Sequence, residues 1–326
     1  MESLDGRDKT ILYYLDMDSR QSFSELGKKI GLHKDVIAYR VKKLQEKGII
    51  KKFYTEINNE KLGYSEAKFY LTYQNVNLQK KQEIIEYLVR SPYTDIVHAL
   101  EGQYDLAVIS SEQNITKFYD VWTDIIKKYR DFFSSQVFCV ECISVTFKKT
   151  FLLDEQRDGR EDRVLSMVRP QDEKVQLDPL DYKILELLSS NARIPTLELA
   201  ETLQIAINTV NARIQKLIKN GVITRFTVHV DWPLIGYRWF KADIVLRDME
   251  KMQKIVEYIQ QDPHLLYRVG SLGYIDLELT FILNNENQLF QIMEDVSSKF
   301  PDVIKNYKSY SITKTHKFYG ADFWNR

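Results

Sequence analysis

The chain of 326 residues is longer than one typical domain core, which indicates two or more domains. Its 44% hydrophobic and 28% charged residues are typical of a globular protein and exclude a disordered chain. Because 46 basic side chains balance 46 acidic ones, the composition also excludes a protein that coats nucleic acid through its overall charge.

The sequence carries no motif of export or of metal chemistry. It has no apolar run of about eighteen residues, and its polar start lacks the apolar core of a signal peptide. Cys139 and Cys142 have the spacing of half a zinc site, but no second pair completes it, and the five histidines show no ligand spacing. No nucleophile motif is present. We therefore expect a cytoplasmic protein without a metal, a cofactor or catalytic residues.

An internal repeat organises the chain. A shift of 173 residues aligns Asp5 with Asp178 and Gly48 with Gly221. Further along, the register slips by two residues, so that Pro92 faces Pro263. Essentially the whole of each half is therefore related to the other half.

The first fifty residues carry three helical patterns that are too short to be stable alone, so they must pack on one another. Ile11 and Leu15 lie on one face of the first pattern. The second begins with the capping box Ser22-x-x-Glu25 and ends before Gly31. Three short helices with a tight central turn are typical of a helix-turn-helix.

The third helix has an apolar inner face and a basic outer face. The stretch from Lys28 to Lys52 holds nine basic side chains against two acidic ones, a net charge of +7. In a helix-turn-helix this helix enters the major groove, where exposed side chains meet bases and phosphates. The candidate DNA-binding residues of the first copy are His33, Lys34, Tyr39, Arg40, Lys42 and Lys43. A merely solvated charged face is the alternative.

The second copy offers a less basic set: Asn208, Asn211, Arg213, Gln215 and Lys216. From Glu201 to Arg225 it has four basic side chains against one acidic one, a net charge of +3. We expect it to hold phosphates less strongly and, through amides that read adenine edges, to contribute specificity more than affinity. A loss of DNA binding by this copy remains open.

The runs IIKKFYTEI and VITRFTVHV alternate apolar and polar residues and predict wing strands after each third helix. From Ser65 the order strand, helix, strand, strand, helix, strand follows, and the second half repeats it. This order predicts a ferredoxin-like sandwich in an α+β fold, with both helices on one face of an antiparallel sheet. We expect the other face to be apolar and to pair with the sheet of the other copy within the chain.

These motifs together resemble the Lrp/AsnC family of feast-famine regulators. The resemblance is carried by Asp5, Asp8, Ile11, Leu12, Arg20, Ser22, Glu25, Leu26, Arg40, Val41, Leu44, Gly48 and Ile50. It implies a sequence-specific transcription regulator with a winged helix-turn-helix and a ligand-sensing domain that dimerises and often binds an amino acid. The implied ligand-binding residues surround two turns and are Gly102, Tyr104, Asp105, Gly273, Tyr274 and Asp276. A hairpin turn capped by a carboxylate is the alternative.

The repeat and the resemblance divide the chain into five segments. Winged helix-turn-helix domains are expected at residues 1–60 and 177–233, and ferredoxin-like ligand-sensing domains at 63–152 and 236–326. A charged linker is expected at 153–176, although an extra helix or strand from Val164 to Val168 remains open. The fused chain would then act as an internal pseudo-dimer, with further homo-oligomers possible.

The chain departs from the family pattern at two positions, and two other functions remain as alternatives. The family usually has serine where this chain has His33 and Ala206, which puts a phosphate contact or a helix cap in doubt. Siroheme decarboxylases resemble the same family and pair two such subunits around a tetrapyrrole, with His98 as a candidate residue here. A sensor or assembly scaffold that does not bind DNA is the other alternative. The lysine-rich third helix favours the DNA-binding regulator.

Overall fold

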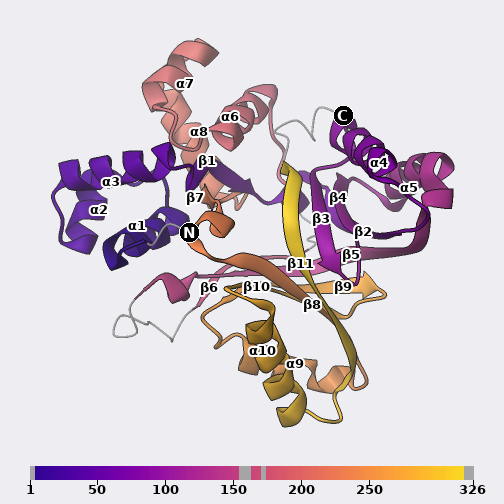
Figure 1. Cartoon of the computed structure of the whole chain (residues 1–326). Coiled ribbons are helices and arrows are strands. Elements are labelled where there is room, and N and C mark those ends of the chain that lie inside the picture. The colour runs from indigo at the N-terminus through magenta and orange to yellow at the C-terminus, as the bar shows by residue number, and fades with distance from the viewer. Residues whose placement is uncertain (1–3, 154–162, 170–173, 319–326) are drawn as a thin grey trace. The chain divides into compact units, whose positions relative to one another are not determined.

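The computed structural model describes residues 4–153, 163–169 and 174–318. These residues form two compact units, and each unit takes segments from both halves of the sequence. The first unit contains the two helical segments, and the second contains the two β-α-β-β-α-β segments (Figure 1). The repeat in the sequence is therefore also a repeat in the fold.

The first helical segment forms α1 (Gly6–Met17), α2 (Phe23–Ile30) and α3 (Lys34–Glu46). The predicted capping box is present, because Ser22 Oγ accepts the Glu25 N–H and the Glu25 carboxylate accepts the Ser22 N–H. Gly31 ends α2 in the left-handed conformation, with φ of 76°. The buried side chains that hold the three helices together are Ile11, Leu12, Leu15, Leu26, Ile37, Val41 and Leu44.

The second helical segment forms α6 (Pro179–Ser190), α7 (Thr196–Leu203) and α8 (Ile207–Lys219). Its buried side chains stand at the same positions after the shift of 173 residues and are Ile184, Leu185, Leu188, Leu199, Val210, Ile214 and Leu217. Both helix-turn-helix heads are therefore built on one apolar pattern.

The predicted wing strands are β1 (Ile50–Ile57) and β7 (Ile223–Val230), and they pair with each other in an antiparallel sheet. Each head thus contributes one strand to a sheet that belongs to both heads. A single strand leaves its backbone N–H and C=O groups unpaired, and the other copy supplies the partners. Two further bonds extend the pairing symmetrically, from Asn58 N to Val222 O and from Asp231 N to Ile49 O, both 2.8 Å long.

In the second unit each half folds as the predicted ferredoxin-like sandwich. The first half comprises β2 (Ser65–Tyr73), α4 (Leu78–Arg90), β3 (Ile96–Gly102), β4 (Leu106–Glu112), α5 (Ile115–Tyr129) and β5 (Phe133–Phe147). The second comprises β8 (Arg238–Leu246), α9 (Met252–Ile259), β9 (Leu265–Gly273), β10 (Leu277–Leu283), α10 (Glu286–Lys299) and β11 (Ile304–Phe318). The α+β fold predicted from the sequence is confirmed.

The strands of the two halves join into one continuous sheet. Each half keeps the ferredoxin-like order, β5-β2-β4-β3 and β11-β8-β10-β9. The long strand β11 then pairs with β3, and the long strand β5 pairs with β9, so that these described strands form a closed ring. Closure removes the exposed edges that would otherwise template aggregation.

Two glycines sit where one half crosses the other. Gly102 pairs with Tyr310 on β11, and Gly273 pairs with Cys139 on β5. Their φ angles are +123° and +129°, and an added Cβ would stand 2.9 Å from Ser309 O or 2.6 Å from Phe138 O. No L side chain fits this backbone approach, so both positions require glycine.

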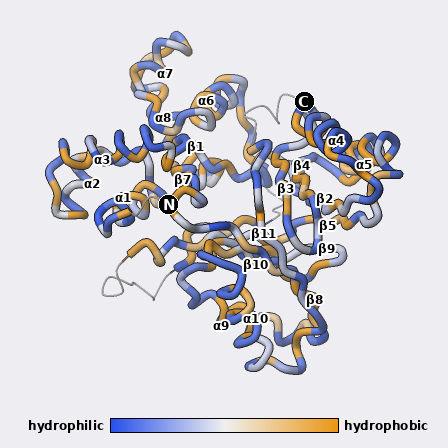
Figure 2. The backbone as a smooth tube through the Cα atoms, in the orientation of Figure 1, coloured by the Kyte–Doolittle hydropathy of each residue, from blue (hydrophilic) through white to orange (hydrophobic). Residues whose placement is uncertain are grey.

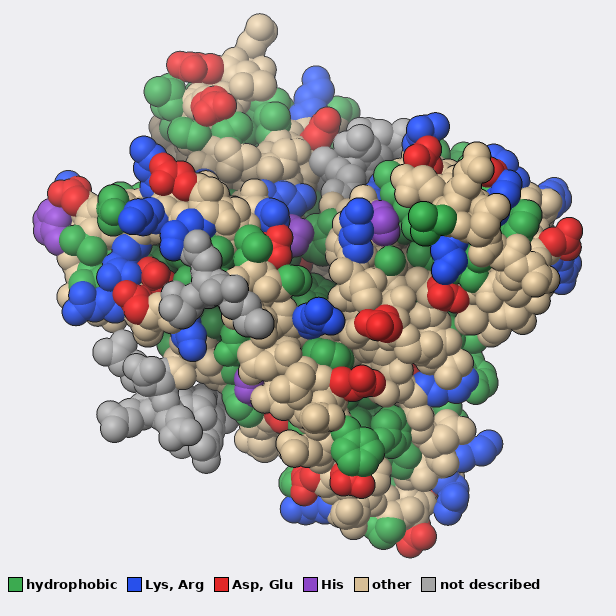
Figure 3. All heavy atoms as spheres, viewed as in Figure 1, with side chains coloured by type: hydrophobic (Ala, Val, Ile, Leu, Met, Phe, Trp, Pro, Cys, Tyr) green, Lys and Arg blue, Asp and Glu red, His purple; other side chains and the backbone are tan. Residues whose placement is uncertain are grey.

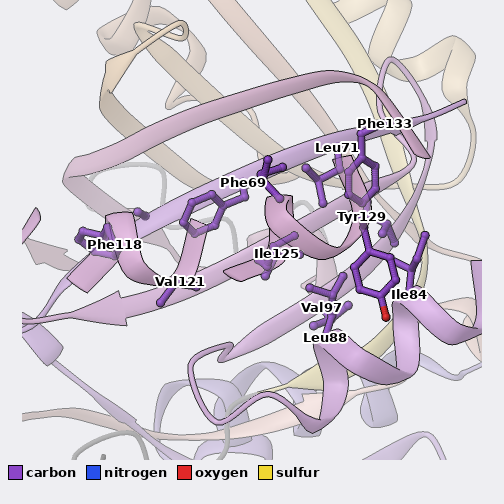
Figure 4. Close-up of a cluster of buried hydrophobic side chains, with 14 residues drawn as sticks. Phe69, Leu71, Ile84, Leu88, Val97, Phe118, Val121, Ile125, Tyr129 and Phe133 are labelled. Atoms are coloured by element: carbon purple, nitrogen blue, oxygen red, sulfur yellow. The ribbon is translucent and has the colours of Figure 1, made fainter. Parts of the chain in front are cut away.

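In each half, one face of the sheet packs on helices, and the other face turns inward. On the helix side of the first half, Phe69, Leu71 and Val97 pack against Leu88 of α4 and Ile125 of α5 (Figure 4). Figure 2 shows the matching alternation of hydrophilic and hydrophobic residues along α4 and α5. Amphipathic helices thus cover one side of the sheet.

The inner face is enclosed by the two copies, as predicted, but the expectation that it is apolar is wrong. Tyr70, Tyr104 and Cys139 of the first half meet Ile275 and Tyr310 of the second half. Buried charged residues lie among them: Lys68, Lys241, Asp243 and Glu278. Charges are tolerated inside because they neutralise one another, a pairing between distant residues that strand periodicity does not reveal.

The predicted linker at 153–176 lies partly outside the described residues, which lack 154–162 and 170–173. Within it, Val164–Val168 forms strand β6, the alternative that the sequence left open. Among the described helices, none combines the length and apolarity needed to cross a membrane.

Replacing Gly273 with alanine should lower the free energy of unfolding by more than about 1 kcal/mol. A side chain strains the backbone at this positive φ, and the added Cβ would also clash with Phe138 O. Gly270→Ala on the same strand is the matched control, since its Cβ would meet only Ile143 Cβ, at 3.9 Å. Urea denaturation measures both. Equal effects of the two substitutions would contradict the crossing geometry.

Candidate nucleic-acid interface

The outer face of α3 presents the basic residues that the sequence predicted. Lys34, Tyr39, Lys42 and Lys43 are all exposed, while Ile37 on the opposite face is fully buried. Figure 3 shows Lys and Arg side chains gathered over the region of α1, α2 and α3. The structure therefore brings these four candidates together on one helix face.

Tyr39 and Lys43 form a pair on this face. The Tyr39 side chain is 59% exposed, and Lys43 Nζ lies 5.3 Å from the centre of its ring. Lys42 Nζ is 3.8 Å from the exposed carboxylate of Glu46, a contact that is weak in water. An aromatic ring flanked by ammonium groups can contact both a sugar or base and the phosphates beside it.

The residue before each recognition helix shows what replaces the missing serine as the helix cap. His33 is the N-cap of α3, and its Nδ1 accepts the Asp35 N–H at 3.4 Å and lies 3.2 Å from Asp35 Oδ2. Ala206 begins α8 without a side-chain cap. The first head thus keeps a cap that the second head has lost.

Arg40 and Arg213, predicted as DNA contacts, also bind carboxylates inside their own heads. Arg40 Nη1 donates to Asp5 Oδ2 at 2.8 Å and to Asp8 Oδ1 at 2.7 Å. Arg213 Nη1 binds Asp178 and Asp181 in the same way, both at 2.7 Å. These bonds tie the recognition helix to the start of the first helix through Nη1 of each guanidinium, and a role of either arginine in DNA binding stays a prediction.

Hydrogen bonds from Arg213 lower the pKa of Asp178 below its ordinary value, and the backbone N–H of Asp181 acts in the same direction. Burial alone would raise the pKa of Asp5, but the Asp8 N–H and Arg40 lower it. Both carboxylates are therefore held in the charged form that the arginines require.

The second recognition helix exposes its amides beside an acidic cleft. Asn208, Asn211, Gln215 and Lys216 are exposed on α8. The cleft, of about 330 Å³, is lined by Asp18, Arg20, Gln21 and Glu25 of the first head and by Asn211, Ile214, Gln215, Ile218 and Phe226 of the second. The lining holds two carboxylates and one guanidinium, so it offers phosphate no excess of positive charge, which agrees with the lower charge of this helix.

A buried charge cluster that the sequence did not predict joins the two heads. Asp16, at the end of α1, is 2% exposed, and its Oδ1 accepts from Lys149 Nζ and, at 2.9 Å, from Thr227 Oγ1. Arg225 Nη1 lies 3.4 Å from Asp16 Oδ2, and Arg225 Nε pairs with Glu56. Burial alone would raise the pKa of Asp16, but Lys149 and Arg225 lower it. The counterpart of Asp16 in the repeat is Ser189, so the cluster exists on one side only.

The turns proposed for ligand binding carry structural bonds. Asp105 Oδ2 accepts the Tyr73 N–H at 2.7 Å, and Asp276 Oδ2 accepts the Leu246 N–H at 2.8 Å. Gly102 and Gly273 are required by the strand crossings. Each carboxylate therefore binds the end of a neighbouring strand, β2 or β8, and ligand binding at these turns stays a prediction.

The two tyrosines of these turns point in different directions. Tyr104 is buried and stacks on Tyr70, with ring centres 4.7 Å apart. Tyr274 is 49% exposed, and Lys308 Nζ lies 4.9 Å from its ring centre. Asp105 and Asp276 are partly exposed, and Tyr274 has the most exposed side chain of the candidates that carry one.

The inner charges of the second unit centre on Glu278. Lys68 Nζ lies 2.9 Å and Lys241 Nζ 2.6 Å from Glu278 Oε1, and Tyr70 donates to Oε2 at 2.5 Å. Lys68 also pairs with Glu141 at 2.6 Å. The two lysines are equivalent in the repeat, whereas the counterpart of Glu278 is an alanine, so one acid serves both cations.

Asp243 and His98 are buried close to this group. Burial first, and then the charge of Glu278, raise the pKa of Asp243 to about 7; Tyr310 donates to its Oδ1 at 3.0 Å. Asp243 Oδ2 has no hydrogen-bond partner among the described residues. Burial, Lys241 and Lys68 lower the pKa of His98 to about 3, and its Nδ1 is 3.1 Å from Thr315 Oγ1. His98 therefore remains a neutral, enclosed imidazole.

The described residues hold no cluster of three or more His, Cys, Asp or Glu side chains suited to a metal ion. Cys139 is buried, and Cys142 is partly buried. Paired helix-turn-helix heads with one strongly basic recognition helix define the class as a DNA-binding protein.

Comparisons with known proteins agree with this class. A family model described as "Winged helix-turn-helix DNA-binding" matches residues 4–51 and 177–224. The HTH-type transcriptional regulator FL11 of Pyrococcus furiosus is 34% identical over 121 residues, which cover 36% of this chain and 79% of FL11. The regulator LrpA of Pyrococcus horikoshii is 48% identical over 62 residues, 19% of this chain and 44% of LrpA. The chain belongs to the Lrp/AsnC family of helix-turn-helix transcription regulators, duplicated in tandem.

A solved structure extends the likeness over the whole fold. The siroheme decarboxylase NirDL superposes with a TM-score of 0.65 and covers 99% of this chain and 96% of its own, at 15% sequence identity. The tandem arrangement is therefore shared with an enzyme of known structure.

Asp16→Asn should lower the free energy of unfolding by about 3–5 kcal/mol, because Lys149 and Arg225 would stay buried without a carboxylate between them. Ser189→Ala at the equivalent position is the control and should change it by less than about 0.5 kcal/mol. Thermal and urea unfolding compare the two. A loss below about 1 kcal/mol for Asp16→Asn would rule out a cluster that binds the heads together.

Asp243→Asn should stabilise the protein relative to the native chain increasingly as the pH rises from about 4 to about 7. The raised pKa of Asp243 means that its protonated form favours folding, and that contribution is lost as the carboxyl ionises at about pH 7. Urea denaturation at pH 5, 6, 7 and 8 measures the difference, with exposed Asp120→Asn as the control. A difference that does not change with pH contradicts the assignment.

Proposed function

We propose that this regulator binds an imperfect pseudo-palindrome with its two heads acting unequally. The observation that carries the proposal is the exposed basic face of α3, formed by Lys34, Tyr39, Lys42 and Lys43 on a winged helix-turn-helix. Such a helix lies in the major groove, and its ammonium groups release counterions from the phosphates. The first head therefore supplies most of the affinity.

The second head contributes recognition more than affinity in this proposal. Its helix exposes Asn208, Asn211, Gln215 and Lys216, of which one is charged. Amide groups can bond adenine edges in two places, whereas a single lysine contributes little to the salt dependence. The acidic side chains Asp18 and Glu25 of the neighbouring cleft support the same division of roles.

We further propose that an amino acid or another small metabolite binds the second unit and alters the spacing of the heads. Tyr274 is the candidate contact, since it is exposed beside Lys308. The pairing of β1 with β7 and the closed ring of strands support an internal pseudo-dimer as the working form. The proposal also includes the assembly of several such chains into a homo-oligomer.

The whole-chain likeness to the siroheme decarboxylase NirDL favours a second candidate function, a tetrapyrrole enzyme. Added siroheme should give a shifted Soret band if the chain binds it, and the same preparation should then fail to retain DNA. DNA retention without such a band excludes the enzyme. A protein that does neither, but changes its oligomeric state with an amino acid, would be the DNA-independent sensor.

Replacing both Lys42 and Lys43 with alanine should weaken binding to every DNA sequence by a similar factor. It should also reduce the slope of log K against log salt by up to about two, since each lost phosphate contact accounts for about 0.9. Fluorescence anisotropy over a salt series measures both quantities. The control is Lys117→Ala with Lys127→Ala, two exposed lysines of α5. Unchanged affinity and slope would remove the first head from the DNA interface.

A further inference from the structure

Two arginines cross between the heads and bind the backbone of the opposite copy. Arg20 Nη1 donates to Ala192 O at 2.6 Å and to Ile194 O at 3.1 Å. Arg193 Nη1 donates to Ser19 O and, at 3.4 Å, to Gln21 O. The shift of 173 residues relates each arginine to the other and each acceptor to its counterpart, so the exchange is reciprocal.

Each arginine also lies over an aromatic ring of the paired strands. The Arg20 guanidinium is 5.3 Å from the ring centre of Phe226, and that of Arg193 is 5.4 Å from Phe53. Phe226 O and Phe53 O in turn accept the N–H groups of Ser19 and Ala192, at 2.8 Å and 3.0 Å. Strand, turn and arginine therefore form one connected contact on each side of the first unit.

The turns held in this way are the ones that place the recognition helices. The first lies between α1 and α2, directly before the helix that packs against α3. The second lies between α6 and α7, directly before the helix that packs against α8. Fixing one turn against the other therefore fixes the position of α3 relative to α8.

The hydrogen bonds that Arg20 and Arg193 make are suited to holding the two heads in a fixed orientation. The described residues offer neither Arg20 nor Arg193 a carboxylate within ion-pair distance, and both bind carbonyl oxygens instead. One guanidinium nitrogen of each arginine, Nη1, reaches two carbonyls of one turn at once, which defines direction as well as distance. The heads are thereby joined at a fixed geometry, which paired strands alone would leave free to twist.

We propose that Arg20 and Arg193 are positioning residues that set the spacing between the two half-sites this regulator accepts. The inference rests on the proposed DNA binding and deepens it. In dimeric helix-turn-helix proteins the distance between half-sites is a geometric consequence of the distance between recognition helices. Neither arginine needs to contact DNA, so base preference within each half-site stays the same when one is removed.

The test is selection of bound DNA from a random pool by the full-length chain and by its Arg20→Met and Arg193→Met variants. Methionine keeps an apolar stem beside the aromatic ring and removes the donors. The wild type should select two half-site motifs at one spacing. Each variant should select the same motifs with a spacing spread over at least one or two further base pairs. Arg7→Met, exposed on α1 outside the exchange, should keep the single spacing.

Each outcome of the selection decides one question. A single, unchanged spacing in both methionine variants overturns the positioning role while leaving DNA binding intact. Failure of the wild type to enrich a two-part motif overturns the proposed function itself. Melting curves show whether the variants are folded; if Arg20→Met is not, Arg193→Met carries the test alone, and unchanged spacing in that variant also overturns the proposal.

Discussion

The backbone pairing between equivalent segments of the two halves is the interaction on which the rest of the structure depends. Neither β1 nor β7 has a described partner in its own head, so each must find one in the other copy. The same requirement recurs in the second unit, where β11 pairs with β3 and β5 pairs with β9. Because each pairing crosses between halves, each unit is held together by backbone bonds between the two copies.

The paired halves differ in the buried side chains at equivalent positions. Asp16 stands opposite Ser189, and Glu278 stands where the first half has an alanine. Each buried acid meets cations from both halves, so a pairing of two like halves would leave a charge unpaired or bury two acids together. The differences in the interior therefore favour pairing within the chain, and the recognition helices also differ, with Lys42 opposite Gln215.

The sequence was sufficient to predict the features that depend on residues close together along the chain. Caps such as Ser22 and Glu25, the apolar period of each helix, and the order of strands and helices predicted both kinds of domain. It was not sufficient where a partner lies far along the chain. Nothing local shows that Asp5 and Asp8 bind Arg40, or that Asp105 accepts the N–H of Tyr73, 32 residues away. Charges buried by partners from the other half cannot be read from strand alternation at all.

The central claim is that one chain contacts DNA at two unequal places, and footprinting tests it most directly. Hydroxyl-radical cleavage of a selected site, bound by the full-length chain over a salt series, should show two protected stretches about one helical turn apart. Protection by the basic first head should depend more steeply on salt than protection by the amide-rich second head. A single protected stretch, or two stretches lost equally as salt rises, would contradict the account of an asymmetric internal dimer.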